Sequence, residues 1–289
     1  MRIVRSNAEM CAAAAEARAA GRSIGLVPTM GAFHGGHHAL MRAARERCDT
    51  VVVSLFVNPA QFEEANDLAA YPRDEARDAA EAAELGVDVL YAPTVQEVYP
   101  AGFATSVRVD GLADVLEGAH RGSGHFAGVC TVVAKLLNVV TPDVAFFGQK
   151  DAQQVAVVRR MVRDLDLPVA LEVVPTVREA DGLAMSSRNR RLDAAERDRA
   201  LALSRALQAA AGAVGAGERD AASIERAARS AMGGVEPEYL ALVDPDSFEP
   251  VQHVNGRVLV AVAARIGATR LIDNTLVHTA ATPGGAPTP

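Results

Sequence analysis

The sequence has no tryptophan and only three cysteines, and it contains no long uncharged run of apolar residues. Cys11, Cys48 and Cys130 are scattered and odd in number, which disfavours a disulfide framework and fits the reducing cytoplasm. No segment approaches the length that crosses a bilayer, and charged residues interrupt the alanine-rich N-terminus where a signal peptide would have an apolar core. We therefore expect a cytoplasmic protein with no membrane partner.

An excess of basic residues is also missing. The net charge is −7 and the isoelectric point is about 5.5, whereas nucleic-acid binding depends on a surplus of basic contacts with phosphate. We expect no nucleic-acid partner, so any site for an anionic ligand must be local. With 289 residues, of which 49% are hydrophobic, the chain is long enough to bury one large core or two modest ones.

Apolar runs of strand length alternate with helix-like stretches in the first part of the chain. Strands are expected at 24–28, 50–57, 87–92, 144–148 and 169–175, and helices at 6–20, 37–48, 73–85, 126–140 and 151–164. The nearly continuous apolar run within 50–57 is typical of a strand that helices cover on both faces. The predicted fold class is α/β, with a doubly wound parallel sheet in a Rossmann-like domain over residues 1–176.

The character of the sequence changes after about residue 176. Long Ala/Arg/Glu-rich helices are expected at 193–213 and 218–231, and β-rich runs follow at 238–243, 257–265 and 270–277. This pattern predicts a smaller C-terminal α+β domain over residues 177–278. The Pro/Gly-rich segment 279–289 is expected to be a disordered tail.

Two common phosphate-binding signatures are absent, but another kind of phosphate loop is indicated. The loop glycines do not fit Gly-x-Gly-x-x-Gly, and no Gly-Lys-Ser/Thr ending is present. Residues 28–37 nevertheless join a strand to a helix through a glycine-rich loop, where free N–H groups and the helix dipole favour phosphate. His34 and His37 are expected to project from the first helical turn toward the same point. Surface histidines or a metal site are alternatives, although no His-Glu-x-x-His pattern or cysteine pair supports zinc.

Polar residues follow three further expected strands. Ligands of an open α/β sheet bind beyond the carboxyl ends of its strands, and these ends carry 58–62, 149–154 and 176–189. Each of these residues also has a simpler explanation when it is taken alone. Asn58 could only shape a turn, Asp151 could only cap a helix, and Arg188 could be a surface charge. Together, the four ends favour one site in a crevice between the two domains.

Five segments closely resemble the pantothenate synthetase family: 28–37, 56–62, 71–73, 147–154 and 181–189. The resemblance runs from near residue 1 to about 278. The family belongs to the nucleotidyltransferases with a His-x-Gly-His signature, and 185–188 is similar to their second, Lys-Met-Ser-Lys-Ser-type loop. The resemblance implies a ligase that joins pantoate to β-alanine with ATP and Mg²⁺, through a pantoyl adenylate, releasing pyrophosphate and then AMP.

The resemblance also implies roles for individual residues. The catalytic set is His37, His34, Lys150, Ser187 and Arg188, whose donors and cations would stabilise charge on the phosphoryl oxygens. The ATP-binding set is Met30, Gly31, Ala32, Phe33, His34, Gly35, Gly36, His37, Gly148, Gln149, Lys150, Asp151, Val177, Met185, Ser186, Ser187 and Arg188. Pantoate is assigned to Gln61, Gln154 and Asn58, β-alanine to Gln61, and the metal to Asp78.

The resemblance also implies a homodimer, and we place its interface in the 96–118 region of the N-terminal domain. The alternative is that the apolar residues of this region cover the domain's own core.

The sequence departs from the family pattern at Gly35 and Gln149, where glutamate is usual. It also departs in the loop 121–126, which is one residue longer and leaves the roles of Arg121 and His125 open. Two other functions stay open: adenylation of a different acid by a related nucleotidyltransferase, and nucleotide binding without turnover.

Overall fold

The computed structural model describes residues 1–62, 68–69 and 71–279, and the chain forms two compact units. The first unit comprises Met1–Val177 and Met185–Ser187, and the second comprises Arg178–Ala184 and the chain from Arg188 onward. The chain therefore returns briefly to the first unit between two parts of the second. Thr279 begins the segment that we expected to be disordered, but its backbone N–H donates to the Gly256 carbonyl at 3.0 Å, and the rest of that segment lies outside the described residues.

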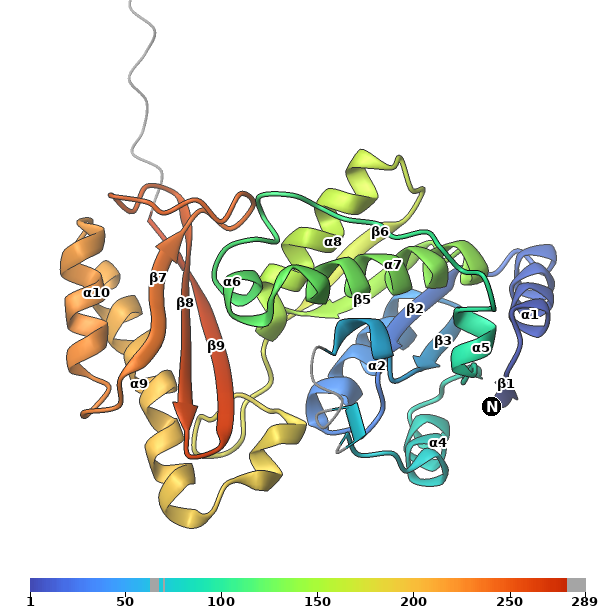
Figure 1. The fold of residues 1–289 in the computed structure, drawn as a ribbon, viewed down its shortest axis with the longest axis horizontal. Helices are drawn as coiled ribbons and strands as arrows, with labels where there is room; N and C mark the ends of the chain where they lie inside the picture. The colour runs from blue at the N-terminus through green and yellow to red at the C-terminus, as the bar shows by residue number, and fades with distance from the viewer. Residues whose placement is uncertain (63–67, 70, 280–289) are drawn as a thin grey trace, which may run out of the picture. The chain divides into compact units, whose positions relative to one another are not determined.

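The first unit is built on a six-stranded sheet in which every pair of neighbours is parallel (Figure 1). Its order is β1-β4-β3-β2-β5-β6, so the chain runs from β2 toward one edge and later from β5 toward the other. The strands are β1 (Arg2–Val4), β2 (Ile24–Thr29), β3 (Thr50–Leu55), β4 (Val89–Tyr91), β5 (Val144–Gly148) and β6 (Ala170–Val174). The strand order reverses between β2 and β5, which is where such sheets bind ligands.

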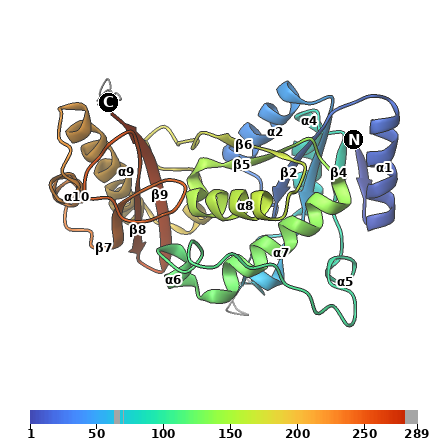
Figure 2. The ribbon, with the colours of Figure 1, turned by 90° about the horizontal axis from the view of Figure 1, so that it is seen from above.

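Helices cover both faces of this sheet, as Figure 2 shows for α2 and α4 on one side and α7 and α8 on the other. The helices of the unit are α1 (Asn7–Ala19), α2 (Gly35–Arg47), α4 (Glu75–Glu84), α5 (Val95–Val98), α6 (Glu117–Arg121), α7 (Ser123–Val140) and α8 (Ala152–Asp164). Double coverage explains why β3 is buried along almost its whole length. The parallel sheet with helices on both faces confirms the predicted fold class.

Two helices begin earlier than the sequence predicts. We expected α2 to begin at residue 37, but it begins at Gly35 because His34 is its N-cap and accepts the Gly36 N–H on its ring. We expected the next long helix to begin at 126, but α7 begins at Ser123. The glycines around its start give no helical pattern, and Gly122 takes the left-handed φ of 73° just before it.

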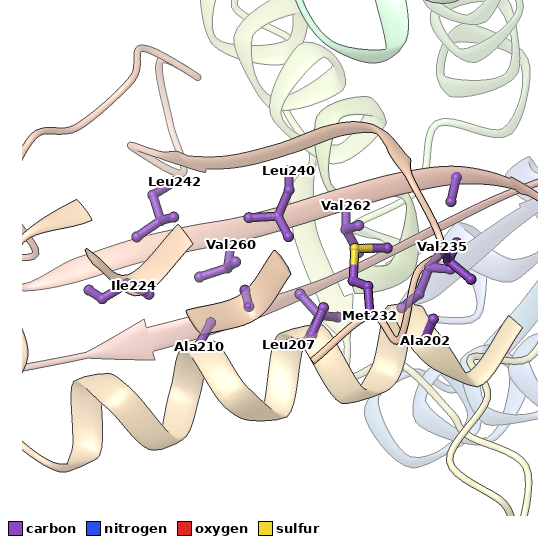
Figure 3. Close-up of a cluster of buried hydrophobic side chains, with 14 of the residues drawn as sticks. Ala202, Leu207, Ala210, Ile224, Met232, Val235, Leu240, Leu242, Val260 and Val262 are labelled. Carbon is purple, nitrogen blue, oxygen red and sulfur yellow. The ribbon is translucent and has the colours of Figure 1, made fainter. Parts of the chain in front are cut away.

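The second unit packs two helices on an antiparallel sheet. Its elements are α9 (Ala194–Gly215), α10 (Ala221–Ser230), β7 (Pro237–Val243), β8 (Arg257–Ile266) and β9 (Thr269–His278), with strand order β7-β8-β9. Figure 3 shows its core, where Leu207 and Ala210 of α9 face Val260 and Val262 of β8. No helix in the described part of the chain is long and apolar enough to cross a membrane.

Candidate active site

The loop between β2 and α2 is held in an unusual shape by a buried carboxylate. Gly31 and Ala32 have left-handed φ values of 82° and 54°. Asp78, which is 2% exposed on α4, accepts the Ala32 N–H on Oδ2 at 2.8 Å and the Phe33 N–H on Oδ1 at 2.9 Å. A Cβ on Gly31 would lie 2.7 Å from Asp78 Oδ2 and 2.6 Å from Leu55 Cδ1, so this position requires glycine.

These contacts give Asp78 a role that the sequence did not indicate. We assigned it to the metal, but both of its oxygens accept backbone N–H groups of the loop. Among the residues that the structure describes, no three His, Cys, Asp or Glu side chains are grouped as a metal site requires. Binding of metal by Asp78 stays a prediction.

The two histidines of the loop lie together, although only one of them is on the helix. The ring centroids of His34 and His37 are 4.2 Å apart, and Phe33 lies 5.5 Å from His37. His34 is the N-cap with an extended backbone, which corrects our placement of both rings on the first helical turn. His37 Nδ1 is buried and has no hydrogen-bond partner among the described residues. Burial, reinforced by His34, lowers the pKa of His37 to about 3, so its ring is neutral at physiological pH.

Lys150 and Asp151 lie near this histidine pair. They belong to η2 (Gln149–Asp151), a 3-10 turn that follows β5, and Lys150 Nζ is 3.6 Å from Asp151 Oδ1. Both charges act on the pKa of His37, which Lys150 lowers and Asp151 raises. Asp151 precedes α8 but its side chain makes no capping hydrogen bond, so capping does not account for it. The carboxyl ends of β2 and β5 thus bring a neutral imidazole, a cation and a carboxylate together.

The segment Met185–Ser187 reaches the start of α2 within the first unit. The Met185 N–H donates to the Val177 carbonyl at 2.9 Å. A Cβ on Gly35 would lie 2.7 Å from Met185 Sδ, so the methionine packs directly over this glycine. Met185 therefore lies against the loop 30–37 and is bonded to Val177, and ATP binding by these two residues stays a prediction. Of the ATP-binding set, Arg188 belongs to the second unit.

Asn58 follows β3 and holds Gln61 in place. Asn58 is 1% exposed, and its Oδ1 accepts the Ala60 N–H at 3.2 Å and the Tyr99 hydroxyl at 2.8 Å. Its Nδ2 donates to Gly128 O and to Gln61 Oε1, both at 3.1 Å. These four bonds use the whole capacity of the amide. These contacts agree with the alternative that Asn58 shapes a turn. Direct binding of pantoate by Asn58 stays a prediction.

The backbone of Gln61 is held from α7. His125 Nδ1 donates to the Gln61 carbonyl at 2.9 Å, and burial together with Arg121 lowers the pKa of His125 to about 4. A Cβ on Gly128 would lie 2.2 Å from the Ala60 carbonyl oxygen, so α7 touches the 3-10 turn η1 (Pro59–Gln61) directly. The longer loop thus still delivers His125 to Gln61. Asp151 raises the pKa of both His125 and His37, which places it near both groups.

The two glutamines at the start of α8 differ in their surroundings. Gln153 is 4% exposed and bonds three backbone groups, donating to Leu112 O and Val115 O and accepting the Glu117 N–H. Gln154, which we assigned to pantoate, is half-buried. Sequence reasoning missed Tyr99 and Gly128, for which no local pattern gave a signal.

The chain is similar to known proteins over nearly its whole length. The family model for pantoate–β-alanine ligase matches residues 2–276. Pantothenate synthetases of Moorella thermoacetica and Heliobacterium modesticaldum are each 53% identical to this chain, over 91% and 96% of it and 94% and 100% of their own lengths. The pantothenate synthetase structure from Thermus thermophilus is 47% identical, with a TM-score of 0.91 over 96% of this chain and all of that one. The pantoate–β-alanine ligase of Francisella tularensis, whose structure is a complex with ATP (β-γ) and β-alanine, is 33% identical, with a TM-score of 0.77 over 96% of this chain and 97% of that one.

Proposed function

Because the chain belongs to the pantoate–β-alanine ligase family, we propose that it condenses pantoate with β-alanine to pantothenate, with ATP converted to AMP and pyrophosphate. The observation that carries the assignment to this site is the loop 30–37, which Asp78 fixes and which places His34 and His37 beside Lys150. The same loop begins α2, where free N–H groups and the helix dipole favour phosphate.

The reaction proceeds in two steps. A carboxylate oxygen of pantoate first attacks the α-phosphorus of ATP, and the bond to pyrophosphate breaks. The amine of β-alanine then attacks the carboxyl carbon of the acyl adenylate, the nitrogen loses a proton, and AMP leaves. Water must be excluded between the steps, because hydrolysis would destroy the adenylate.

Negative charge grows on the phosphoryl oxygens in the first step, and the residues around the loop suit that charge. Lys150 supplies a fixed cation, and neutral His37 donates an N–H without itself requiring a proton from solution. Ser186 and Ser187, which belong to the same unit as the loop, are assigned to this set of donors, and the part of Arg188 stays a prediction. Mg²⁺ would neutralise the β- and γ-phosphates.

Pantoate and β-alanine are assigned to the neighbouring amides. Gln61 and Gln154 bind pantoate through neutral side chains that match hydroxyl and carboxylate groups, and Gln61 also meets β-alanine. Asn58 acts through Gln61, to which it donates at 3.1 Å. The protein is further inferred to work in the cytoplasm, as its scattered cysteines suggest.

Exchange of labelled pyrophosphate into ATP tests this proposal. We expect exchange that requires pantoate and proceeds without β-alanine, because activation of the acid precedes formation of the amide. Exchange with another acid in place of pantoate would identify a related nucleotidyltransferase instead. Binding of ATP with no exchange would identify a nucleotide-binding module.

A further inference from the structure

The orientation of the Asn58 amide is fixed by two backbone groups. The Ala60 N–H can only donate, so the atom of Asn58 that meets it must be Oδ1. The Gly128 carbonyl can only accept, so the atom that meets it must be Nδ2. The usual ambiguity between the oxygen and nitrogen of a side-chain amide therefore does not arise here.

This orientation passes to Gln61. Nδ2 of Asn58 also meets the Gln61 side chain, and a donor there requires that the Gln61 atom be Oε1. The Nε2 group of Gln61 is then the atom directed away from Asn58. Gln61 consequently offers N–H donors to a ligand, while its own acceptor is used inside the protein.

Tyr99 completes the chain of bonds at its other end. Its hydroxyl donates to Asn58 Oδ1 at 2.8 Å, and burial raises the pKa of Tyr99 to about 12, so the phenol keeps the proton that it donates. Its ring packs between Phe56 and Phe103, with centroid distances of 6.2 and 5.2 Å. Tyr99 follows α5, a short helix far in sequence from Gln61.

We propose that Tyr99 and Asn58 are positioning residues that present Gln61 to the acid substrate as a hydrogen-bond donor. Neither needs to touch the substrate. This arrangement favours an acid whose carboxylate or hydroxyl oxygen accepts a hydrogen bond from Gln61 Nε2. This inference rests on the proposed role of Gln61 in binding pantoate.

Tyr99→Phe tests the inference, because it removes only the hydroxyl and keeps the ring. We expect the KM for pantoate in pyrophosphate exchange to rise by roughly fivefold, as for the loss of one buried hydrogen bond, while the Kd for ATP without pantoate stays unchanged. Tyr91→Phe is the matched control. Tyr91 is buried, whereas Tyr99 is half-buried, and it likewise donates its hydroxyl to an asparagine, Asn7, outside this network, so loss of the Tyr91 hydroxyl should leave the KM for pantoate unchanged.

Asn58→Asp is the stronger variant, because a carboxylate cannot donate to Gln61 Oε1. The Gln61 amide should then rotate and turn its oxygen toward the ligand, raising the KM for pantoate by more than roughly tenfold. Thermal unfolding of each variant checks that it is folded. If Asn58→Asp does not fold, Tyr99→Phe alone tests the inference. A Tyr99→Phe enzyme with the wild-type KM for pantoate, or with an equal loss of affinity for ATP, overturns the inference.

Gln61→Ala separates this inference from the proposed function. If Gln61→Ala raises the KM for pantoate and Tyr99→Phe does not, Gln61 binds the substrate but needs no positioning by Tyr99. If Gln61→Ala leaves the KM unchanged, the assignment of pantoate to Gln61 is wrong, and the inference falls with it.

Discussion

His37 is kept neutral in the place where the charge of a nucleotide would arrive. A histidine that was already protonated would contribute attraction to any anion, whereas a neutral buried imidazole gains most from the developing charge of a reaction at phosphorus. Its Nδ1 has no partner among the residues that the structure describes, so no hydrogen bond at this nitrogen fixes its tautomer. The pattern of loop and helix predicted that His34 and His37 meet. The neutral state of His37 could not be predicted, because burial in the folded protein, reinforced by His34, causes it.

Removal of either main donor should slow the reaction strongly. We expect His37→Ala and Lys150→Ala each to lower turnover by roughly a hundredfold or more, in the range for the loss of one transition-state donor. Steady-state kinetics at saturating pantoate, β-alanine and ATP measures the effect. A variant with nearly the wild-type turnover would show that its residue lacks the assigned role.

Buried His125 should make stability depend on pH in a definite direction. Its folded pKa of about 4 lies below its unfolded value of about 6.5, so below pH 6.5 the unfolded chain binds a proton that the folded protein rejects. Stability should therefore fall as the pH decreases from 6.5 to 4, by about 1.4 kcal/mol per pH unit from this residue. Denaturant unfolding across this range measures the slope.

His125→Asn is the control for that slope, because asparagine keeps a donor for the Gln61 carbonyl but does not titrate. The variant should lose less stability between pH 6.5 and 4 than the wild type does. An unchanged slope would assign the acid sensitivity to other groups.

At the scale of elements, the site depends on contacts that bring distant segments to the ends of β2, β3 and β5. The sequence predicted most strands and helices of the parallel sheet, because long apolar runs and helical periodicity are strong local signals. It missed β1, which has only three residues, two of them exposed. It also missed the anchoring of the loop by α4 and of η1 by α7, because a long-range hydrogen bond leaves no local pattern.

Asp78→Asn should distinguish the anchoring of the loop from metal binding. The variant puts an amide nitrogen where a carboxylate oxygen now accepts a backbone N–H, so an N–H group of the loop loses its acceptor and thermal stability should fall even without Mg²⁺. Differential scanning fluorimetry with and without Mg²⁺ gives the readout. Unchanged stability with a raised requirement for Mg²⁺ would instead support the predicted metal role.

The contact between α7 and η1 can be tested with two glycines of the same helix. Gly128→Ala would force a Cβ to within 2.2 Å of the Ala60 carbonyl oxygen, between two backbones that cannot both stay in place. We expect it to destabilise the protein by about 1–3 kcal/mol and to raise the KM for pantoate. The Cβ of Gly124→Ala would meet no atom of the described residues within 4 Å, so this change should be neutral or slightly stabilising, since alanine favours helix. Equal effects of the two changes would contradict a specific close approach.

At the scale of the whole molecule, the family resemblance implies a dimer, and the apolar residues of the 96–118 region differ in their exposure. Val98 and Leu112 are buried, as the alternative of a self-covering segment requires. Phe103 and Val115 are 37% and 39% exposed, and Lys135 Nζ lies 4.9 Å above the Phe103 ring. The exposed pair is where a second copy would gain most by burying apolar surface.

We therefore expect light scattering at micromolar concentration to give a dimer, and a mass near the 30.2 kDa of one chain would reject it. Phe103→Glu with Val115→Glu should shift the protein toward the monomer, because burying two carboxylates without partners is costly. Leu165→Glu is the control, since Leu165 is 50% exposed and lies outside this region, after α8. If the protein stays a dimer after Phe103→Glu with Val115→Glu as well as after Leu165→Glu, the dimer is supported but its interface lies elsewhere.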